Sequence, residues 1–286
     1  MRGATSHSYF SQRLRLHYLD WGNSSAPPLL LIHGNRDHAH NWDWTAARLR
    51  DRYHVIAPDL RGHGDSQWSA GSMYAPAEFV YDISQLVHQQ RLAPLRVVAH
   101  SLGGNIAMRY AGTFPDEVER LVVIEGWGGV AAVEQRPSAA DRMRGWIETQ
   151  RSLAARQPRR YASLDDAYRR MLEANPHLSA EQARHLTIHG TNQNEDGTYT
   201  WKFDNYTHGS HLLDLAPDEI RELWRNIRCP VLLISGSESM SRSGGDPAAL
   251  AAGFADARHV IVEGAGHWVQ HDRLERFLTL VEGFID

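Results

Sequence analysis

The stretch Val97-Val98-Ala99-His100-Ser101-Leu102-Gly103-Gly104 decides the fold. An apolar run of strand length ends at Ala99 and a helical pattern starts at Gly104, so Ser101 stands at a sharp turn from strand to helix. Such a turn needs small residues two positions before and after the serine, because the helix packs tightly against the strand it leaves. Ala99 and Gly103 meet this need, although glycine is usual at both positions. The stretch predicts a nucleophile elbow, which presents the Ser101 hydroxyl at the end of a strand.

Apolar runs of strand length alternate with helical patterns on both sides of this turn. The apolar runs cover 29–32, 55–57, 97–99, 121–124, 231–234 and 260–262, and the helical patterns include 79–90, 104–114 and 272–284. Residues 14–18 alternate between apolar and polar side chains, which predicts an antiparallel edge strand. The order of elements predicts an α/β fold with a mostly parallel central sheet of about eight strands and helices on both faces.

The stretch 127–226 is far longer than one crossover helix needs. Within it, residues 141–156, 164–173 and 179–185 have helical patterns, and the polar, glycine-bearing segment 192–200 predicts a turn or hairpin. We therefore expect a core domain made of residues 1–126 and 227–286. A helical cap, residues 127–226, is expected to be inserted after the sixth strand.

Composition limits the class of ligand. The formal net charge of the 286 residues is -4, so no basic surplus is available to bind nucleic acid or an anionic membrane. A small-molecule substrate fits this balance better. The only cysteine is Cys229, which excludes an intramolecular disulfide. The first ten residues lack the apolar stretch of a signal peptide and no later segment has the length of a membrane span, which predicts a cytoplasmic protein.

A serine hydroxyl is a weak nucleophile until a base removes its proton, so the chain needs a partner for Ser101. Among the 17 histidines, position favours His267, which lies in a loop after the last apolar run and before the final helical pattern. The serine precedes the histidine, as the elbow motif requires. We predict that His267 is the general base.

A place for negative charge is also needed during attack on a carbonyl carbon. The segment His33-Gly34-Asn35 follows the first apolar run, and by itself it is typical of a simple turn. The backbone N–H groups of Asn35 and Leu102 could together form an oxyanion hole.

The chain resembles the α/β-hydrolase superfamily over essentially its whole length, in the capped serine hydrolase and esterase branch. In chain order, the matching motifs are His33-Gly34-Asn35 with Trp42 downstream, Asp59 to Ser66, the turn at Ser101, and Gly264 to His267. The resemblance implies that Asp59, Arg61 and His63 hold a loop by hydrogen bonds and take no part in catalysis. The cap also resembles those of serine hydrolase-like proteins.

The acid that should orient His267 has two candidates. In most of the superfamily it follows the strand predicted at 231–234, where Glu238 lies one residue early. In branches that resemble haloalkane dehalogenases it follows the preceding core strand, where Glu125 ends the run 121–124. We favour Glu125 and keep Glu238 as the alternative.

These residues favour hydrolysis of a carboxylic ester, thioester, lactone or amide through an acyl-enzyme. Two alternatives stay open: a carbon-carbon bond hydrolase of vinylogous diketones, and a non-catalytic ligand-binding member of the fold. Candidate substrate-binding residues are Trp127, Trp146, Trp201, His100 and Trp268. The alternative for the cap residues among them, that they form a small hydrophobic core within the cap, explains their presence equally well.

No metal or organic cofactor is implied by these motifs. Asp37, His38 and His40 lie close together in one predicted loop, but the loop supplies no clear third and fourth ligand. We therefore expect no metal site.

Overall fold

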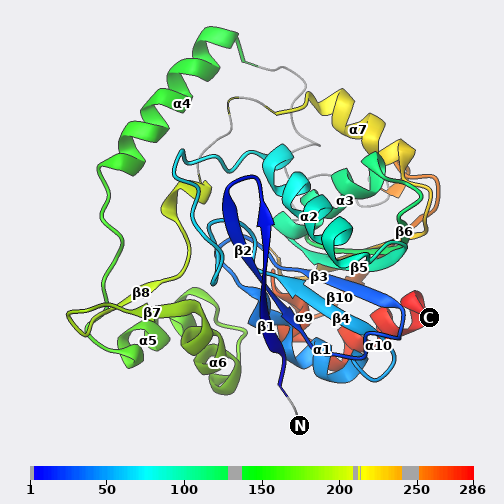
Figure 1. Cartoon of the computed structure of the whole chain (residues 1–286), viewed down its shortest axis with the longest axis horizontal. Coiled ribbons are helices and arrows are strands. Elements are labelled where there is room, and N and C mark those ends of the chain that lie inside the picture. The colour runs from blue at the N-terminus through cyan, green and yellow to red at the C-terminus, as the bar shows by residue number, and fades with distance from the viewer. Residues whose placement is uncertain (1–2, 128–136, 209–211, 213, 240–250) are drawn as a thin grey trace.

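A central sheet of eight strands organises the computed structural model, which describes residues 3–127, 137–208, 212, 214–239 and 251–286 (Figure 1). The strands are β1 (Thr5–Ser11), β2 (Leu14–Asp20), β3 (Pro28–Ile32), β4 (His54–Pro58), β5 (Leu95–His100), β6 (Val118–Ile124), β9 (Val231–Gly236) and β10 (Ala257–Val262). Their order across the sheet is β1-β2-β4-β3-β5-β6-β9-β10. β2 pairs antiparallel with β1 and with β4, and the remaining pairs are parallel. The predicted α/β fold with a mostly parallel sheet of about eight strands is confirmed.

The central strands are apolar on both faces because helices cover both sides of the sheet. Leu30 and Ile32 of β3 point into one hydrophobic cluster, and Leu29 and Leu31 point into the other. This alternation is the two-residue period of a strand. Parallel strands buried in this way read as continuous apolar runs in a sequence.

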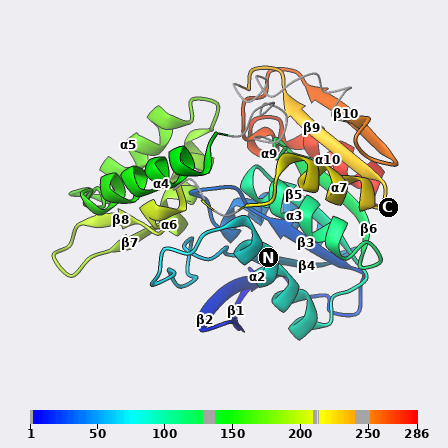
Figure 2. The ribbon, with the colours of Figure 1, turned by 90° about the horizontal axis from the view of Figure 1, so that it is seen from above.

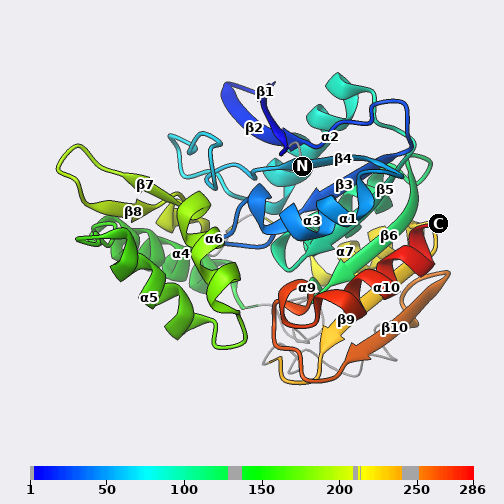
Figure 3. The ribbon, with the colours of Figure 1, turned by 90° about the horizontal axis from the view of Figure 1, so that it is seen from below.

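Each face of the sheet has its own set of helices. Figure 2 shows α2 (Pro76–Gln90), α3 (Leu102–Thr113) and α7 (Pro217–Asn226) on one face. Figure 3 shows α1 (Asp43–Leu49), α9 (Val269–Asp272) and α10 (Leu274–Ile285) on the other. The helical pattern expected at 272–284 corresponds to α10, which begins two residues later because Arg273 has the non-helical angles φ -139 and ψ 55.

The segment expected to form the cap follows β6 and lies to one side of the sheet (Figure 2). It contains α4 (Ala139–Ala154), α5 (Leu164–Ala174), α6 (Ala180–Gly190), the hairpin of β7 (Thr191–Gln193) and β8 (Tyr199–Trp201), and η2 (Asn205–His208). Ser138, Ser163 and Ser179 each cap the start of one of these helices by accepting a backbone N–H bond.

The end of the range expected to form the cap belongs instead to the core. α7 packs against α3, and its Ile220 and Trp224 are buried in the larger core cluster. The apolar side of α7 packs into the core. Position in the chain alone therefore assigned α7 wrongly to the cap. Among the helices of the described ranges, none is both long enough and apolar enough to cross a bilayer.

Candidate active site

Ser101 occupies a strained turn between β5 and α3. Its backbone angles are φ 52 and ψ -116, a conformation that non-glycine residues rarely adopt and that is often found at functional positions. The neighbouring glycine explains how α3 comes so close to the sheet. A Cβ on Gly103 would lie 2.5 Å from the backbone oxygens of Ile32 and His33. The Ala99 methyl is fully buried and is accommodated at the other side of the turn.

The structure brings Ser101 and His267 together although they are 166 positions apart in the chain. Ser101 Oγ lies 3.0 Å from His267 Nε2. His267 stands in the loop between β10 and α9, and its carbonyl oxygen accepts a hydrogen bond from His100 Nε2 at 2.9 Å. The serine and the predicted base are therefore within proton-transfer distance.

Glu125 lies behind the imidazole, at the end of β6. Its Oε2 is 3.7 Å from His267 Nδ1, and its side chain is 1% exposed. The N–H of Gly236 donates to Oε1 at 2.8 Å, and the Ser239 hydroxyl donates to Oε2 at 2.9 Å. Like Ser101, Glu125 has a positive φ, of 53°. The contact with His267 is longer than a hydrogen bond, but it is within the range of an ion pair, and catalytic hydrogen bonds are often loose in the absence of substrate.

Glu238 faces a different partner. Its Oε2 lies 3.7 Å from Nε2 of His177 in the cap, and its side chain is 56% exposed. A carboxylate that is half in water and directed at another histidine is poorly placed to orient His267. Of the two acids left open by the sequence, the geometry favours Glu125.

The two candidate oxyanion donors lie on either side of the serine turn. Leu102 is the first residue of α3, so its N–H has no acceptor within the helix. Asn35 follows Gly34, where an added Cβ would lie 3.1 Å from Ser101 Cβ. The Asn35 side chain is fixed because its Oδ1 accepts from Arg36 N–H at 3.0 Å and lies 3.0 Å from His63 Nε2.

Buried polar side chains hold the loops around this turn. His33 Nε2 accepts from the N–H of Leu60 at 3.0 Å, and burial, followed by the nearby His63, lowers the pKa of His33 to about 3. Asp59 accepts from the N–H groups of Ala39 and Asp65 at 2.7 and 2.9 Å. Burial alone would raise the pKa of Asp59, but the contact with His17 outweighs it and lowers the pKa well below its usual value.

Arg61 has a structural role of the same kind. Its guanidinium donates two hydrogen bonds to Asp82, at 2.6 and 2.7 Å, and a third to Glu78 at 2.9 Å. Its charge is thus neutralised by buried and half-buried carboxylates.

A cavity of about 510 Å³ opens beside His267 under the cap. Apolar walls come mainly from aromatic side chains: Tyr161, Trp201, Phe203 and Trp268. Three arginines, Arg36, Arg159 and Arg170, also line it. A neighbouring cavity of about 470 Å³ shares His267 and Trp268 and includes Leu178 and Glu238. Tyr161, Arg159 and Arg170 were not among the predicted substrate-binding residues, because no sequence pattern distinguishes them from surface residues.

Three predicted substrate-binding residues do not line either of these cavities in the described part of the chain. Trp127 packs on the core, with its ring edge-on to His259 at 5.7 Å. Trp146 is half-buried in the middle of α4. His100 is buried and supports the His267 loop; burial, and then the neighbouring His267, lowers its pKa well below the usual value. Trp201 and Trp268 line the cavity of about 510 Å³ beside His267.

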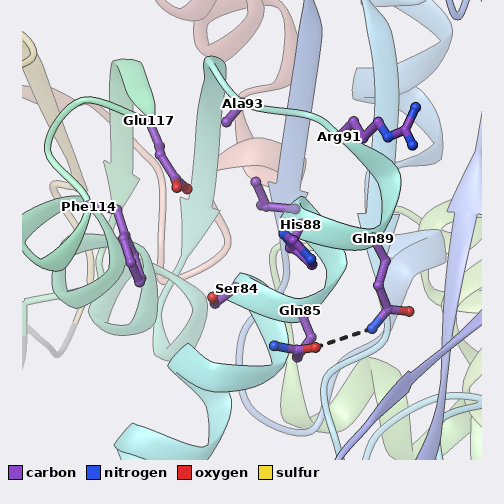
Figure 4. Close-up of a pocket in the computed structure, with 9 residues that line it drawn as sticks. Ser84, Gln85, His88, Gln89, Arg91, Ala93, Phe114 and Glu117 are labelled. Atoms are coloured by element: carbon purple, nitrogen blue, oxygen red, sulfur yellow. Dashed lines mark hydrogen bonds between the residues drawn. The ribbon is translucent and has the colours of Figure 1, made fainter.

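A larger hollow of about 780 Å³ lies at the other end of the sheet (Figure 4). It is lined by the last turns of α2, with Ser84, Gln85 and His88, and by Ala93 and Glu117. Ala93 precedes β5 whereas Ser101 follows it, and six strand residues separate them by about 20 Å. Ligands of open α/β sheets bind at the carboxyl ends of the strands, so this hollow is set apart from the serine.

Comparisons with known proteins agree with this geometry. The family model described as "Alpha/beta hydrolase family" matches residues 29–280. Esterase Rv0045c from Mycobacterium tuberculosis is 29% identical over 275 residues, which cover 94% of this chain and 85% of that protein. Serine hydrolase-like protein 2 from Homo sapiens is 27% identical over 217 residues, 75% of this chain and 69% of that protein.

Solved structures share the fold over nearly the whole length. The thioesterase domain from the curacin biosynthetic pathway superposes with a TM-score of 0.85 at 24% identity, covering 98% of this chain and all of that domain. Because the family model spans both the core strands and the cap, the match is not confined to one motif. The chain therefore belongs to the alpha/beta hydrolase family and is a hydrolase.

Proposed function

We propose that the chain is a serine hydrolase that cleaves a carboxylic ester, or a related thioester, lactone or amide, through an acyl-enzyme. The contact of 3.0 Å between Ser101 Oγ and His267 Nε2 at a strained strand-helix turn carries this proposal. The buried carboxylate of Glu125 behind His267 supports it. The mycobacterial relative is named an esterase, which points to the same reaction class.

The course of the reaction follows from these positions. Ser101 Oγ attacks the carbonyl carbon while His267 Nε2 takes its proton, and the C=O electron pair moves to the oxygen. The N–H groups of Leu102 and Asn35 are the proposed donors to that oxyanion. When the tetrahedral intermediate collapses, the bond to the leaving group breaks and His267 returns the proton to that group. Water, deprotonated by the same imidazole, then releases the acid and restores Ser101.

Glu125 has an orienting role in this scheme. Its negative charge keeps the Nδ1–H of His267 directed toward the carboxylate, which leaves Nε2 free to take the serine proton. It also stabilises the imidazolium that forms during attack.

The cavity beside His267 supports a small-molecule substrate. A volume of about 510 Å³ lies within the range of pockets that bury a small ligand. Trp201 and Trp268 would contact an apolar acyl or alcohol group. Arg36, Arg159 and Arg170 place positive charge around the same space, so we propose a substrate with an anionic substituent.

A serine-directed fluorophosphonate probe tests the proposal, with nitrophenyl esters as substrates. Labelling should occur at Ser101, and Ser101→Ala should lose both labelling and ester hydrolysis. Ser84→Ala, a serine lining the distant hollow, is the matched control and should retain both. Unlabelled wild-type protein would favour a non-catalytic ligand-binding role. Labelling without ester turnover, together with cleavage of a vinylogous diketone, would favour carbon-carbon bond hydrolysis.

A further inference from the structure

Four possible metal ligands meet where the cap touches the core. His40 lies in η1 (Ala39–Trp42) and Asp43 is the first residue of α1, while His185 and His189 lie on α6 of the cap. One ligand atom from each of the four lies within 4.8 Å of the others. α6 contacts η1 directly, and Figure 3 shows the two elements side by side.

The spacing within each element brings the side chains to one place. His185 and His189 are four positions apart, so they share one face of α6. Asp43 Oδ2 lies 2.9 Å from His40 Nδ1 and 2.9 Å from His185 Nε2. The rings of His40 and His189 are stacked, with centroids 3.7 Å apart. The cluster therefore has contributions from both sides of the junction.

The chemistry of the four side chains suits a cation. Asp43 supplies a carboxylate oxygen, and His40, His185 and His189 each supply an imidazole nitrogen. Metal ions bind the deprotonated carboxylate and the neutral imidazole.

The other polar residues of the loop are engaged elsewhere. Asp37 accepts hydrogen bonds from Asn41 Nδ2 at 2.5 Å and from His38 N–H at 2.8 Å. His38 Nε2 lies 3.0 Å from the carbonyl oxygen of Leu186, to which it donates. Of the three loop residues considered from the sequence, only His40 belongs to the cluster.

We propose that His40, Asp43, His185 and His189 form a tetrahedral zinc site that joins the cap to the core. Imidazole nitrogens and carboxylate oxygens are both ligands that Zn²⁺ binds in proteins. Ligand atoms around a tetrahedral zinc ion are about 3.3 Å apart when the bonds are 2.0–2.1 Å long. Small side-chain rotations would bring the four atoms to that spacing. Since four protein ligands complete the coordination, the site is structural and has no open position for water.

Zinc at this position would stabilise the cap wall of the substrate cavity. α6 is followed immediately by β7 and β8, and Trp201 at the end of β8 lines the cavity beside His267. In the absence of the ion, Asp43 still bridges His40 and His185, so the metal-free chain keeps a connection between the two parts. The metal-free protein can therefore serve as the reference state.

Calorimetric titration of chelator-stripped, full-length protein with zinc chloride tests the proposal. We expect one ion per chain and, with Co²⁺ in place of Zn²⁺, the intense visible absorption of tetrahedral cobalt. The Tm should rise by about 5–10 °C at a free zinc concentration about 100 times the Kd. No stoichiometric binding would overturn the proposal.

Variants from the two elements locate the site. His189→Gln and His40→Gln should each weaken zinc binding by at least about 100-fold, since loss of an outer partner of a ligand already costs about 10- to 100-fold. His88→Gln, an exposed histidine of α2, is the control and should bind zinc as the wild type does. The Tm of each metal-free variant shows that it is folded. If both ligand variants kept wild-type affinity, the ion would be bound elsewhere and the proposed site would be wrong.

Discussion

Replacing Glu125 by glutamine is the sharpest test of the proposed catalytic acid, because this change removes charge and keeps shape. In the wild-type protein the N–H of Gly236 lies 2.8 Å from Glu125 Oε1, and the glutamine oxygen can still accept this hydrogen bond. The Ser239 hydroxyl, 2.9 Å from Oε2, can accept from the new amide N–H, since a hydroxyl both donates and accepts. We therefore expect Glu125→Gln to fold normally.

The expected loss of rate follows from the distance to His267. Opposite unit charges at the observed 3.7 Å attract by about 4.5 kcal/mol at an effective dielectric constant of about 20. His267 is 44% exposed, so solvent screening reduces this figure. We expect kcat to fall by about 10²- to 10³-fold, less than the roughly 10⁴-fold loss found where the acid and imidazole are fully hydrogen-bonded.

The assay is steady-state hydrolysis of a nitrophenyl ester, with Glu238→Gln as the matched control. Glu238 is half exposed and faces His177, so the control should keep kcat within about threefold of wild type. The reasoning is refuted if Glu125→Gln retains near-full kcat while Glu238→Gln loses two orders of magnitude.

Three further predictions concern stability and selectivity. Gly103→Ala should destabilise the fold by more than about 3 kcal/mol in urea unfolding, because the added Cβ would meet backbone oxygens at 2.5 Å. Gly283→Ala is the matched control. Nothing lies within 4 Å of its added Cβ, so it should stabilise α10 by about 0.5–1 kcal/mol. Burial lowers the pKa values of His33 and His271 to about 3, below the unfolded value near 6.5, so the unfolded state binds more protons as pH falls. Stability should drop between pH 6.5 and 3 by up to about 3 kcal/mol per pH unit for the pair, and an unfolding midpoint that is unchanged from pH 7 to 5 would contradict this. Arg159→Ala should raise KM about tenfold for a nitrophenyl ester that carries a carboxylate and leave KM for a neutral ester unchanged; equal effects on both esters would argue against an anionic substrate.

Local patterns were sufficient to predict the sheet and the elbow. Strands buried on both faces must be apolar throughout, so β3, β5, β6 and β9 were visible as apolar runs. The turn at Ser101 requires small neighbouring residues because α3 packs tightly against the sheet, and Gly103 meets this requirement. This steric effect acts over only a few residues of the chain. The loop position of His267 followed from chain order alone.

Contacts between distant segments were decided only by the tertiary structure. The choice between Glu125 and Glu238 depends on which carboxylate is buried near His267, and neighbouring residues in the chain do not specify that. His100 is next to Ser101 in the sequence and Trp127 is the first residue of the range expected to form the cap, yet His100 supports the His267 loop and Trp127 packs on the core. Position in the sequence could not separate these roles from substrate binding.

The histidine cluster shows the same division most clearly. From the sequence, too few metal ligands lie near His40 to complete a metal site. The missing ligands, His185 and His189 on α6, lie about 145 positions further along the chain. The residues themselves determined the strands, the elbow and the order of serine and histidine, since these depend on short-range sterics and periodicity. The packing of α6 on η1 decided that His40, Asp43, His185 and His189 meet, because burial of apolar surface between separate elements sets their relative position.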